Sequence, residues 1–306
     1  FGWDTFRDTF RDTFRDIYRD IYRDIYRDIY RDIYRDKLGK SEMRVLVTGA
    51  ASGIGRATCL RLAALGREGG SAAAIAAVDI APSAALDALY EQLTEQGATC
   101  LPLIGDLGNA EVPAHLVDQA CNEFGGLDGL VSNAGVNCPG RLVDYAVEDW
   151  DRLFAVNTRA TWLLGKAAHG ALKDSGGAVV TVASMSGSNA HANLGAYAPS
   201  KAAVIMLMRV MAQEFGADGI RVNSVSPGMV RTGMTTRVYE NNEVAQGRAD
   251  LVPLGRIAEP EDIAEAIAYL LSPQSRYING HDLVVDGGLT GNFLGRLPGL
   301  TAITKG

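Results

Sequence analysis

The chain has 306 residues, of which 47% are hydrophobic and 21% charged, a balance typical of one large globular α/β domain or two small ones. Its formal net charge of −7 argues against general binding to nucleic-acid phosphates, and no uninterrupted apolar run approaches the roughly 20 residues of a membrane-spanning helix. The four cysteines show neither metal-site spacing nor a disulfide framework, so we expect reduced thiols in a cytoplasmic protein: Cys59, Cys100, Cys121 and Cys138.

Residues 1–42 differ from the rest of the chain. Positions 4 to 36 repeat a short unit, first DTFR and then DIYR. Each Asp would meet the Arg three positions later on a helix, but a period of four exceeds the helical period of about 3.6, so the aromatic stripe would spiral around the axis. An assembly arm, a leader or tag-like segment upstream of a natural start at Met43, and a ligand-binding segment are the alternatives for this extension.

From Met43 onward, short apolar segments alternate with longer segments that read as helices. The apolar segments predict strands at 44–49, 73–80, 99–106, 127–135, 177–184, 220–228 and 282–288. Predicted helices lie between them at 53–65, 112–124, 150–172, 198–215 and 261–271. This alternation predicts a single α/β domain over 43–306, with a doubly wound parallel sheet covered by helices on both faces. Ligands of such folds bind beyond the carboxyl ends of the strands.

The first predicted strand leads into the glycine-rich segment VTGAASGIG, in which Gly49, Gly53 and Gly55 have the spacing GxxxGxG. Glycine permits a tight turn and lets the backbone approach a pyrophosphate without a Cβ in the way. The helix that follows offers free N–H groups to phosphates. Because the segment joins a strand to a helix, a phosphate cradle that includes Ser52 and Ile54 is favoured over a merely structural turn.

Asp79, at the end of the second predicted strand, indicates which dinucleotide binds. A carboxylate at this position accepts hydrogen bonds from a ribose diol and repels a 2′-phosphate. None of Ala51, Ser52 and Ile80 is basic, so we expect NAD rather than NADP. The connection into this strand is longer than usual, and Asp87 is the nearby alternative carboxylate.

Two later strand ends add candidates for cofactor binding. Asp106 follows the third predicted strand, where it either binds the adenine amino group or caps the next helix. The fourth strand ends in NAG at 133–135. There Gly135 lets the backbone approach the cofactor, whereas Asn133 is suited to tie adjacent strands together.

The segment SMSGSNAHANLGAYAPSK, from Ser184 to Lys201, carries the residues suited to proton transfer. Tyr197 and Lys201 are four positions apart and share one face of a predicted helix. A tyrosine has a pKa of about 10, and the nearby ammonium is expected to lower it. Tyr197 then serves as base in alcohol oxidation and as acid in ketone reduction. Ser184 is expected to donate a hydrogen bond to the substrate oxygen, and the Asn157 amide to hold a water that relays protons to Lys201.

Taken together, these motifs resemble those of the short-chain dehydrogenase/reductase family between Met43 and about Thr290. The matching segments are TGAASGIG at 48–55, Asp106–Leu107, NAG at 133–135 (with Ala134), Asn157, Ser184, YAPSK at 197–201 and PGMVRT at 227–232. The resemblance implies a Rossmann fold, a nicotinamide cofactor, and catalytic roles for Asn157, Ser184, Tyr197 and Lys201. It also implies homotetramers or dimers, and a nicotinamide side lined by Pro227, Gly228, Val230 and Thr232.

Substrate contacts are expected in two segments. Residues 231–256 are long and partly polar and follow the sixth predicted strand, so they predict a lid that closes over the substrate. Met229 and Met234 are candidates for its apolar wall, with core packing as the alternative. Asn189 and His191 precede Tyr197 and are the other candidates, and a solvated loop position is the alternative for His191. No histidine or cysteine spacing indicates a metal site.

The sequence therefore predicts an NAD-dependent oxidoreductase that acts on a secondary alcohol or its ketone, with no nucleic acid or membrane as partner. Two alternatives stay open. One is an NADPH-dependent 3-oxoacyl-thioester reductase, and the other is a non-catalytic nucleotide-binding assembly protein on the same fold.

Overall fold

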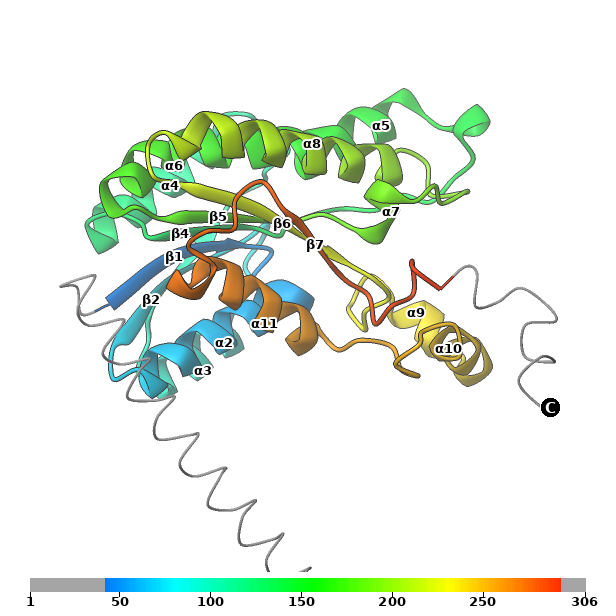
Figure 1. Cartoon of the computed structure of the whole chain (residues 1–306), viewed down its shortest axis with the longest axis horizontal. Coiled ribbons are helices and arrows are strands. Elements are labelled where there is room, and N and C mark those ends of the chain that lie inside the picture. The colour runs from blue at the N-terminus through cyan, green and yellow to red at the C-terminus, as the bar shows by residue number, and fades with distance from the viewer. Residues whose placement is uncertain (1–41, 293–306) are drawn as a thin grey trace, which may run out of the picture.

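The computed structural model describes residues 42–292. The predicted extension therefore lies outside the described residues except for Glu42, as does the chain from 293 onward. The strands form one sheet in the order β3-β2-β1-β4-β5-β6-β7 with every neighbouring pair parallel (Figure 1). The predicted parallel sheet is confirmed, with strands β1 Glu42–Thr48, β2 Ala72–Asp79, β3 Thr99–Ile104, β4 Gly129–Ser132, β5 Ala178–Val182, β6 Arg221–Pro227 and β7 Asp282–Val285.

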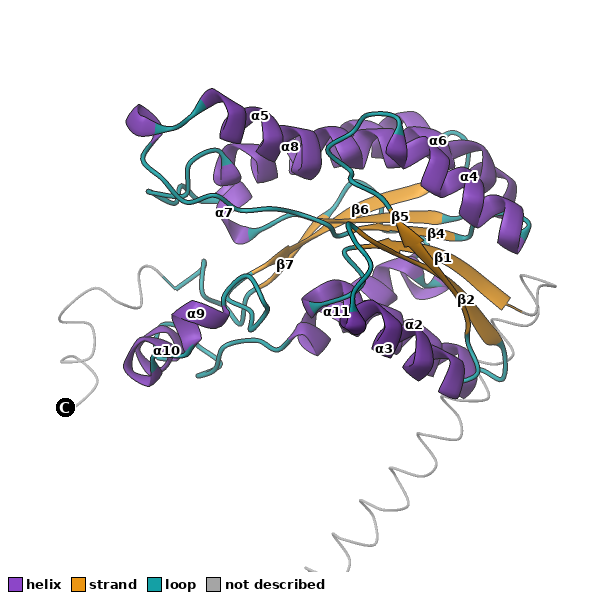
Figure 2. Cartoon of the chain, turned by 180° about the vertical axis from the view of Figure 1, so that it is seen from behind, coloured by secondary structure: helices purple, strands orange, loops and turns teal. Residues whose placement is uncertain are grey.

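Helices cover both faces of the sheet (Figures 1 and 2). One layer consists of α2 (Gly53–Glu68), α3 (Ala84–Glu95) and α11 (Pro260–Leu271). The opposite layer consists of α4 (Val112–Phe124), α6 (Ala160–Ser175) and α8 (Tyr197–Gly216), with α5 (Val147–Phe154) preceding α6. Short helices stand at the carboxyl ends of the strands: α7 (Met185–Ser188), α9 (Thr236–Tyr239) and α10 (Asn242–Ala249). The fold is the predicted three-layer Rossmann arrangement.

The strands send alternate side chains into two separate cores, as the period of two requires. In β1, Val45 and Val47 belong to the cluster under α2, α3 and α11, whereas Leu46 belongs to the cluster under α4, α6 and α8. All three side chains are fully buried. Burial of apolar surface on both faces stabilises the sheet and explains why its strands read as continuous apolar runs.

The predicted helix 150–172 is interrupted in the structure. It consists of the end of α5, a π-helical turn at Ala155–Arg159, and most of α6. A π-turn widens the helix by one residue and is frequent at functional sites. Asn157 lies in this turn and is 1% exposed. The short helices α7, α9 and α10 are not among the helices predicted from the sequence.

Candidate active site

The turn between β1 and α2 forms a cradle of backbone. Gly49 has φ +66 and Gly53 has φ +51, a left-handed conformation that favours glycine. Gly55 is in the helix, and a Cβ there would lie 2.6 Å from Asn133 Nδ2 and 2.7 Å from the Gly49 carbonyl carbon. Ser52 is the N-cap of α2 and makes no side-chain capping bond. The N–H groups at this helix start are therefore available to an anion.

Asn133 joins β1 and β4, the neighbouring strands between which the order of the sheet reverses. Its Nδ2 donates to the Thr48 carbonyl at 2.9 Å, and its backbone N–H donates to Thr48 Oγ1 at 3.0 Å. Asn133 thus ties β4 to β1, as predicted. The tie also brings the NAG segment against the glycine turn, because Asn133 Nδ2 donates to the Gly49 carbonyl at 3.3 Å.

Asp79 points toward the glycine turn. Its Oδ2 accepts a hydrogen bond from the Ala51 backbone N–H at 2.9 Å, and its Oδ1 accepts one from Ile80 at 2.8 Å. The carboxylate is therefore fixed in place beside the cradle. The longer connection into β2 does not displace it, because α2 continues to Glu68 and uses the additional residues. Asp87 instead lies exposed on α3.

Asp106 lies in a turn after β3, where its Oδ1 accepts a hydrogen bond from the Gly108 N–H at 2.8 Å. It does not cap the next helix, because the N-cap of α4 is Glu111. The capping alternative is therefore wrong. The neighbouring Leu107 is 6% exposed and packs in the core.

A cavity of about 230 Å³ lies at the carboxyl ends of β1, β4, β5 and β6. Fifteen of the residues singled out from the sequence line it: Gly49, Ser52, Gly53, Ile54, Asn133, Ala134, Gly135, Ser184, Tyr197, Lys201, Pro227, Gly228, Val230, Thr232 and Met234. Eight do not: Gly55, Asp79, Asp106, Leu107, Asn157, Asn189, His191 and Met229. Four lining residues were missed, although each lies within two positions of a predicted one: Val182, Ala183, Gly233 and Thr235.

Ser184 and Tyr197 both line this cavity. Ser184 is the N-cap of α7, and its Oγ accepts a hydrogen bond from the Ser186 N–H at 3.1 Å. This contact leaves the hydroxyl hydrogen free to point elsewhere. Tyr197 is the first residue of α8. Burial raises the pKa of the Tyr197 phenol, and a hydrogen bond from the Ser184 side chain lowers it in part.

The direction of this pKa shift differs from the lowering expected from Lys201. Lys201 Nζ lies 5.8 Å from the centroid of the Tyr197 ring, and it donates instead to the Val182 carbonyl at 2.7 Å. The ammonium therefore has its hydrogen bond to the strand end rather than to the phenol. In the protein alone, the cost of burying a phenolate outweighs the attraction of this charge.

Lys201 itself is strongly affected by burial. Its side chain is 4% exposed, and burial lowers the pKa of the ammonium from 10.5 to about 8. Burying a cation without a carboxylate partner is costly. A buried lysine with a lowered pKa that lines a cavity is a candidate for a functional residue.

Asn157 reaches the same region from the π-turn. Its Oδ1 accepts a hydrogen bond from the Val136 N–H at 2.8 Å, and its Nδ2 donates to the Val136 carbonyl at 3.1 Å and to Ser200 Oγ at 3.0 Å. Both amide hydrogens therefore have protein partners. A Cβ at Gly135 would lie 3.3 Å from Asn157 Oδ1 and 3.4 Å from Lys201 Nζ, so this glycine lies against both side chains.

The expected substrate residues lie in different environments. Met234 lines the cavity and is 53% exposed. Met229 packs against the small apolar cluster of α9 and α10, in agreement with the alternative that it is a core residue. Asn189 donates to the Met185 carbonyl at 2.9 Å. His191 Nδ1 is hydrogen-bonded to Ser186 Oγ at 3.2 Å, two residues from Ser184.

The predicted lid segment, 231–256, folds into α9 and α10, with a core of its own around Tyr239 and Ala249. Its two ends are joined at their base, where Arg231 N–H donates to the Ala258 carbonyl at 2.9 Å. Within residues 42–292, no group of histidine, cysteine and carboxylate side chains is arranged to hold a metal. None of the helices described is long and apolar enough to span a bilayer.

Known proteins match this chain over most of its length. The family model described as Enoyl-(Acyl carrier protein) reductase matches residues 49–290. The chain belongs to the short-chain dehydrogenase/reductase family. The (3R)-3-hydroxyacyl-CoA dehydrogenase of Rattus norvegicus is 38% identical over 254 residues, 80% of this chain and 95% of the relative. The cis-4-hydroxycyclohexanecarboxylate dehydrogenase of Sinomonas cyclohexanicum is 38% identical over 252 residues, 82% of this chain and 97% of that protein.

A solved structure from Beutenbergia cavernae, with NADP bound at low occupancy, superimposes with a TM-score of 0.75 at 31% identity, covering 81% of this chain and 97% of the other. Membership in the short-chain dehydrogenase/reductase family makes this protein a hydride-transfer oxidoreductase that uses a nicotinamide cofactor.

Proposed function

We propose that this short-chain dehydrogenase/reductase interconverts a secondary alcohol and its ketone with NAD(H), using Tyr197 as general acid and base. The observation that carries the proposal is that Ser184, Tyr197 and Lys201 line one cavity together with the glycine turn. A hydroxyl donor, a phenol and a buried ammonium therefore meet beside a backbone cradle for phosphates. The names of the two relatives, which specify a 3-hydroxyacyl-CoA and a 4-hydroxycyclohexanecarboxylate, also support a secondary alcohol.

The cradle suits a dinucleotide because Gly49 and Gly53 line the cavity and leave room that a side chain would fill. At Gly49, a Cβ would lie 2.9 Å from Asn133 Nδ2, and at Gly53, 3.2 Å from the Thr232 side chain. The residues proposed to hold the cofactor are the glycine turn, Asp79 and Lys201, with Thr232 at the nicotinamide side. When bound, the nicotinamide supplies the hydride chemistry.

The chain's own residues handle the proton. In oxidation, the Tyr197 phenolate takes the proton of the substrate hydroxyl, and in reduction the phenol returns it to the carbonyl oxygen. The Ser184 hydroxyl donates to the same oxygen as charge develops on it. Lys201, with a pKa of about 8, exchanges protons with Tyr197 through the region that Asn157 borders.

The preference for NAD rests on Asp79. Its carboxylate is held beside the cradle by two backbone N–H groups, and it would repel a 2′-phosphate. Arg56, the first basic residue of α2, donates to Gln92 Oε1 at 2.6 Å rather than into the cradle. The competing possibility is an NADPH-dependent 3-oxoacyl-thioester reductase. The acyl-CoA substrate in the name of the rat relative supports this alternative. Comparison of kcat/KM for NAD and NADP separates the two, and a clear NADP preference would refute the Asp79 argument.

The decisive test of the site is Tyr197→Phe. Loss of the general acid and base should reduce turnover by about 100-fold to 10,000-fold. NADH binding, followed by fluorescence, should stay unchanged because the ring remains. The assay is an NAD-coupled screen across secondary alcohols. Unaltered turnover of the variant would contradict the proposed role, and unaltered NADH binding separates a chemical defect from an unfolded protein.

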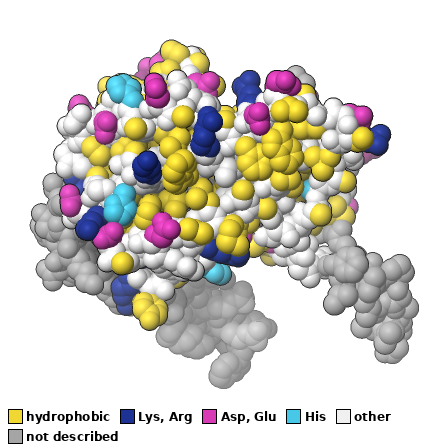
Figure 3. All heavy atoms as spheres, turned by 90° about the horizontal axis from the view of Figure 1, so that it is seen from above, with side chains coloured by type: hydrophobic (Ala, Val, Ile, Leu, Met, Phe, Trp, Pro, Cys, Tyr) yellow, Lys and Arg dark blue, Asp and Glu magenta, His cyan; other side chains and the backbone are white. Residues whose placement is uncertain are grey.

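We also propose that the chain forms a homo-oligomer, with a tetramer favoured over a dimer, and that it is cytoplasmic. Support for assembly comes from large exposed side chains on α6 and α8: Trp162 is 46% exposed, Met206 56% and Val210 45%. Figure 3 looks onto this helix layer and shows hydrophobic side chains gathered on it. The four free cysteines support a reducing compartment. Light scattering of the full chain and of a chain lacking 1–42 tests the assembly and the contribution of the extension.

A further inference from the structure

Two loops border the mouth of the site, and they are paired with each other. The first follows β4 and runs through Cys138 and Gly140; the second runs from Asn193 to Ala196, directly before Tyr197. Gly140 N–H donates to the Asn193 carbonyl at 3.0 Å, and Gly195 N–H donates to the Gly140 carbonyl at 2.9 Å. Tyr197 thus directly follows a loop that is held by hydrogen bonds to a segment about 50 positions earlier in the chain.

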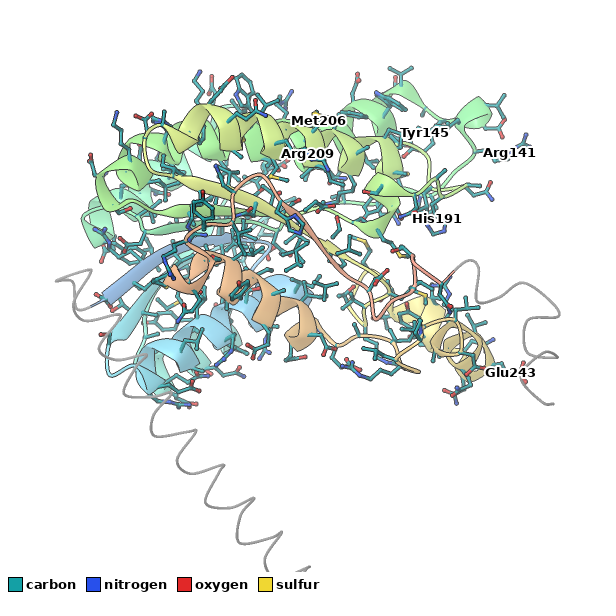
Figure 4. All side chains as sticks on the ribbon, in the orientation of Figure 1. Arg141, Tyr145, His191, Met206, Arg209 and Glu243 are labelled. Carbon is teal, nitrogen blue, oxygen red and sulfur yellow. The ribbon has the colours of Figure 1, made fainter. Side chains whose placement is uncertain are left out.

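Tyr145 lies where these two loops meet. It is the partly buried residue of a stretch whose other members, from Arg141 to Glu148, are all exposed. Its hydroxyl donates to the Cys138 carbonyl at 2.8 Å. Figure 4 labels Tyr145 near the beginning of α8, between Arg141 and the helix. An aromatic ring that is shielded within an exposed stretch indicates a specific contact.

The Tyr145 ring packs against both loops through their glycines. A Cβ at Gly195 would lie 2.8 Å from Tyr145 Cδ2 and closer still to Cε2 and Cζ, and a Cβ at Gly140 would lie 3.1 Å from Cδ2. Gly195 also has φ +53. Only a glycine fits at Gly195, both for its backbone conformation and for the ring that covers it.

The first turn of α8 is held by two kinds of contact. Its later residues are tied to other elements, since Asn157 Nδ2 donates to Ser200 Oγ and Lys201 donates to the Val182 carbonyl, whereas its first residue follows the covered loop directly. Its N-cap, Ala196, makes no side-chain capping bond, and Tyr197 N–H donates to the Leu194 carbonyl at 3.1 Å. The backbone position of Tyr197, the first residue of the helix, therefore follows from the loop that Tyr145 covers. Burial raises the pKa of Tyr145, and a hydrogen bond from the Ala196 backbone acts in the opposite direction, which agrees with a hydroxyl that touches both loops.

We propose that Tyr145 is a positioning residue: by clamping the Gly195 loop onto the Cys138 loop, it fixes the Tyr197 phenol relative to Ser184. The kinetic consequence rests on the proposed function, but the placement of Tyr197 does not. A displacement of about 1 Å at a reacting group costs roughly 100-fold in rate. Tyr145 itself lines neither the cavity nor the cradle.

Tyr145→Ala tests the clamp. We expect kcat to fall by about 30- to 100-fold, while the Kd for NADH stays within about twofold. Tyr145→Phe keeps the ring on Gly195 and should restore most of the activity, because the ring supplies the packing. The matched control is Tyr269→Ala on α11, a tyrosine 44% exposed, which should leave kcat unchanged.

A double-mutant cycle with Gly195→Ala isolates the contact. In the wild-type background, the added Cβ collides with the Tyr145 ring and should lower kcat strongly. In the Tyr145→Ala background, the ring is absent, so the same change should cost less and retain only the part that the left-handed backbone of Gly195 imposes. Strictly additive effects, or a Tyr145→Ala enzyme with unchanged kcat, would overturn the proposal.

Two further readouts do not need turnover. Hydrogen exchange of the amides at 193–197 should accelerate in Tyr145→Ala but not in Tyr269→Ala, and the titration of Tyr197, followed by NMR of labelled tyrosine, should shift. Unchanged exchange together with an unchanged titration would also overturn the proposal. If no secondary alcohol is turned over by the wild type, the proposed function fails, and these two measurements decide the role of Tyr145 by themselves.

Discussion

The Nζ of Lys201 donates a hydrogen bond to the Val182 carbonyl at 2.7 Å. This contact fixes the ammonium at the end of β5, two residues before Ser184. A hydrogen bond to a neutral carbonyl only partly replaces the water that burial removes. Burial of Lys201 therefore carries a cost in folding stability, and this cost depends on pH.

The first prediction concerns this pH dependence. The pKa of Lys201 is about 8 in the folded chain against 10.5 ordinarily, so the unfolded chain binds more protons between these values. The free energy of unfolding should therefore rise as pH increases from about 8 to about 10.5, by at most roughly 3 kcal/mol. Lys201→Met should lack this rise. Urea unfolding of both proteins at several pH values measures the difference, and equal pH slopes would contradict the assignment.

The second prediction concerns Ser184. Its hydrogen bond lowers the pKa of Tyr197 against the effect of burial, so Ser184→Ala should raise that pKa further. Alcohol oxidation needs the phenolate, and its pH profile should therefore move to higher pH, with kcat reduced about 10- to 1,000-fold. Ser186→Ala is the control, because Ser186 bonds to His191 rather than to Tyr197. A profile that moves to lower pH would contradict the direction of this contact.

Much of the fold and most of the cavity were predictable from the sequence because their signals are local. Apolar runs between glycines locate the strands, and residues at strand ends line the cavity because parallel strands end at one edge. Tyr197 and Lys201 were predictable as a pair because helical spacing alone places them on one face.

What was missed depends on contacts between distant residues. The π-turn that carries Asn157 has no pattern of its own within the predicted helix 150–172. The direction of the Tyr197 pKa shift depends on the balance between the cost of burying the phenolate and the attraction of Lys201, whose Nζ lies 5.8 Å from the ring centroid. The spacing of the two residues in the sequence gives neither quantity. Tyr145 was not singled out at all, because its importance lies in contact with Gly195 across 50 residues of chain.

The third prediction tests the cofactor preference. Asp79→Ala removes the carboxylate that would repel a 2′-phosphate, and it removes the acceptor of the Ala51 N–H. The ratio of kcat/KM for NAD over that for NADP should fall by about 10- to 100-fold, the value of a charged hydrogen bond. The control is Asp87→Ala, because Asp87 is exposed on α3 and should leave the ratio unaltered. Equal ratios in the wild type and Asp79→Ala would locate the preference elsewhere.

The fourth prediction concerns the structural contribution of Asn157. Asn157→Ala removes three hydrogen bonds and leaves the Val136 N–H and carbonyl without this partner. We expect the free energy of unfolding to fall by about 2–4 kcal/mol. Asn189→Ala loses a single exposed bond and should cost less than about 1 kcal/mol. Chemical denaturation measures both, and comparable losses would show that the Asn157 contacts contribute little.

The last prediction uses two helical glycines that differ in their surroundings. A Cβ at Gly55 would lie 2.7 Å from the Gly49 carbonyl carbon, whereas a Cβ at Gly170 on α6 would meet nothing within 4 Å. Gly55→Ala should therefore displace the cradle, weaken NADH binding at least about tenfold and destabilise the fold by about 1–3 kcal/mol.

Gly170→Ala should instead stabilise the chain by about 0.5–1 kcal/mol, because alanine loses less backbone entropy in a helix. NADH fluorescence titration and thermal unfolding compare the two variants under the same conditions. Since both changes add one methyl group to a helix, propensity alone predicts stabilisation in each case. If Gly55→Ala loses stability while Gly170→Ala gains it, the loss at Gly55 comes from the close approach of α2 to the turn after β1. A Gly55→Ala variant that is stabilised and binds NADH fully would refute this geometry.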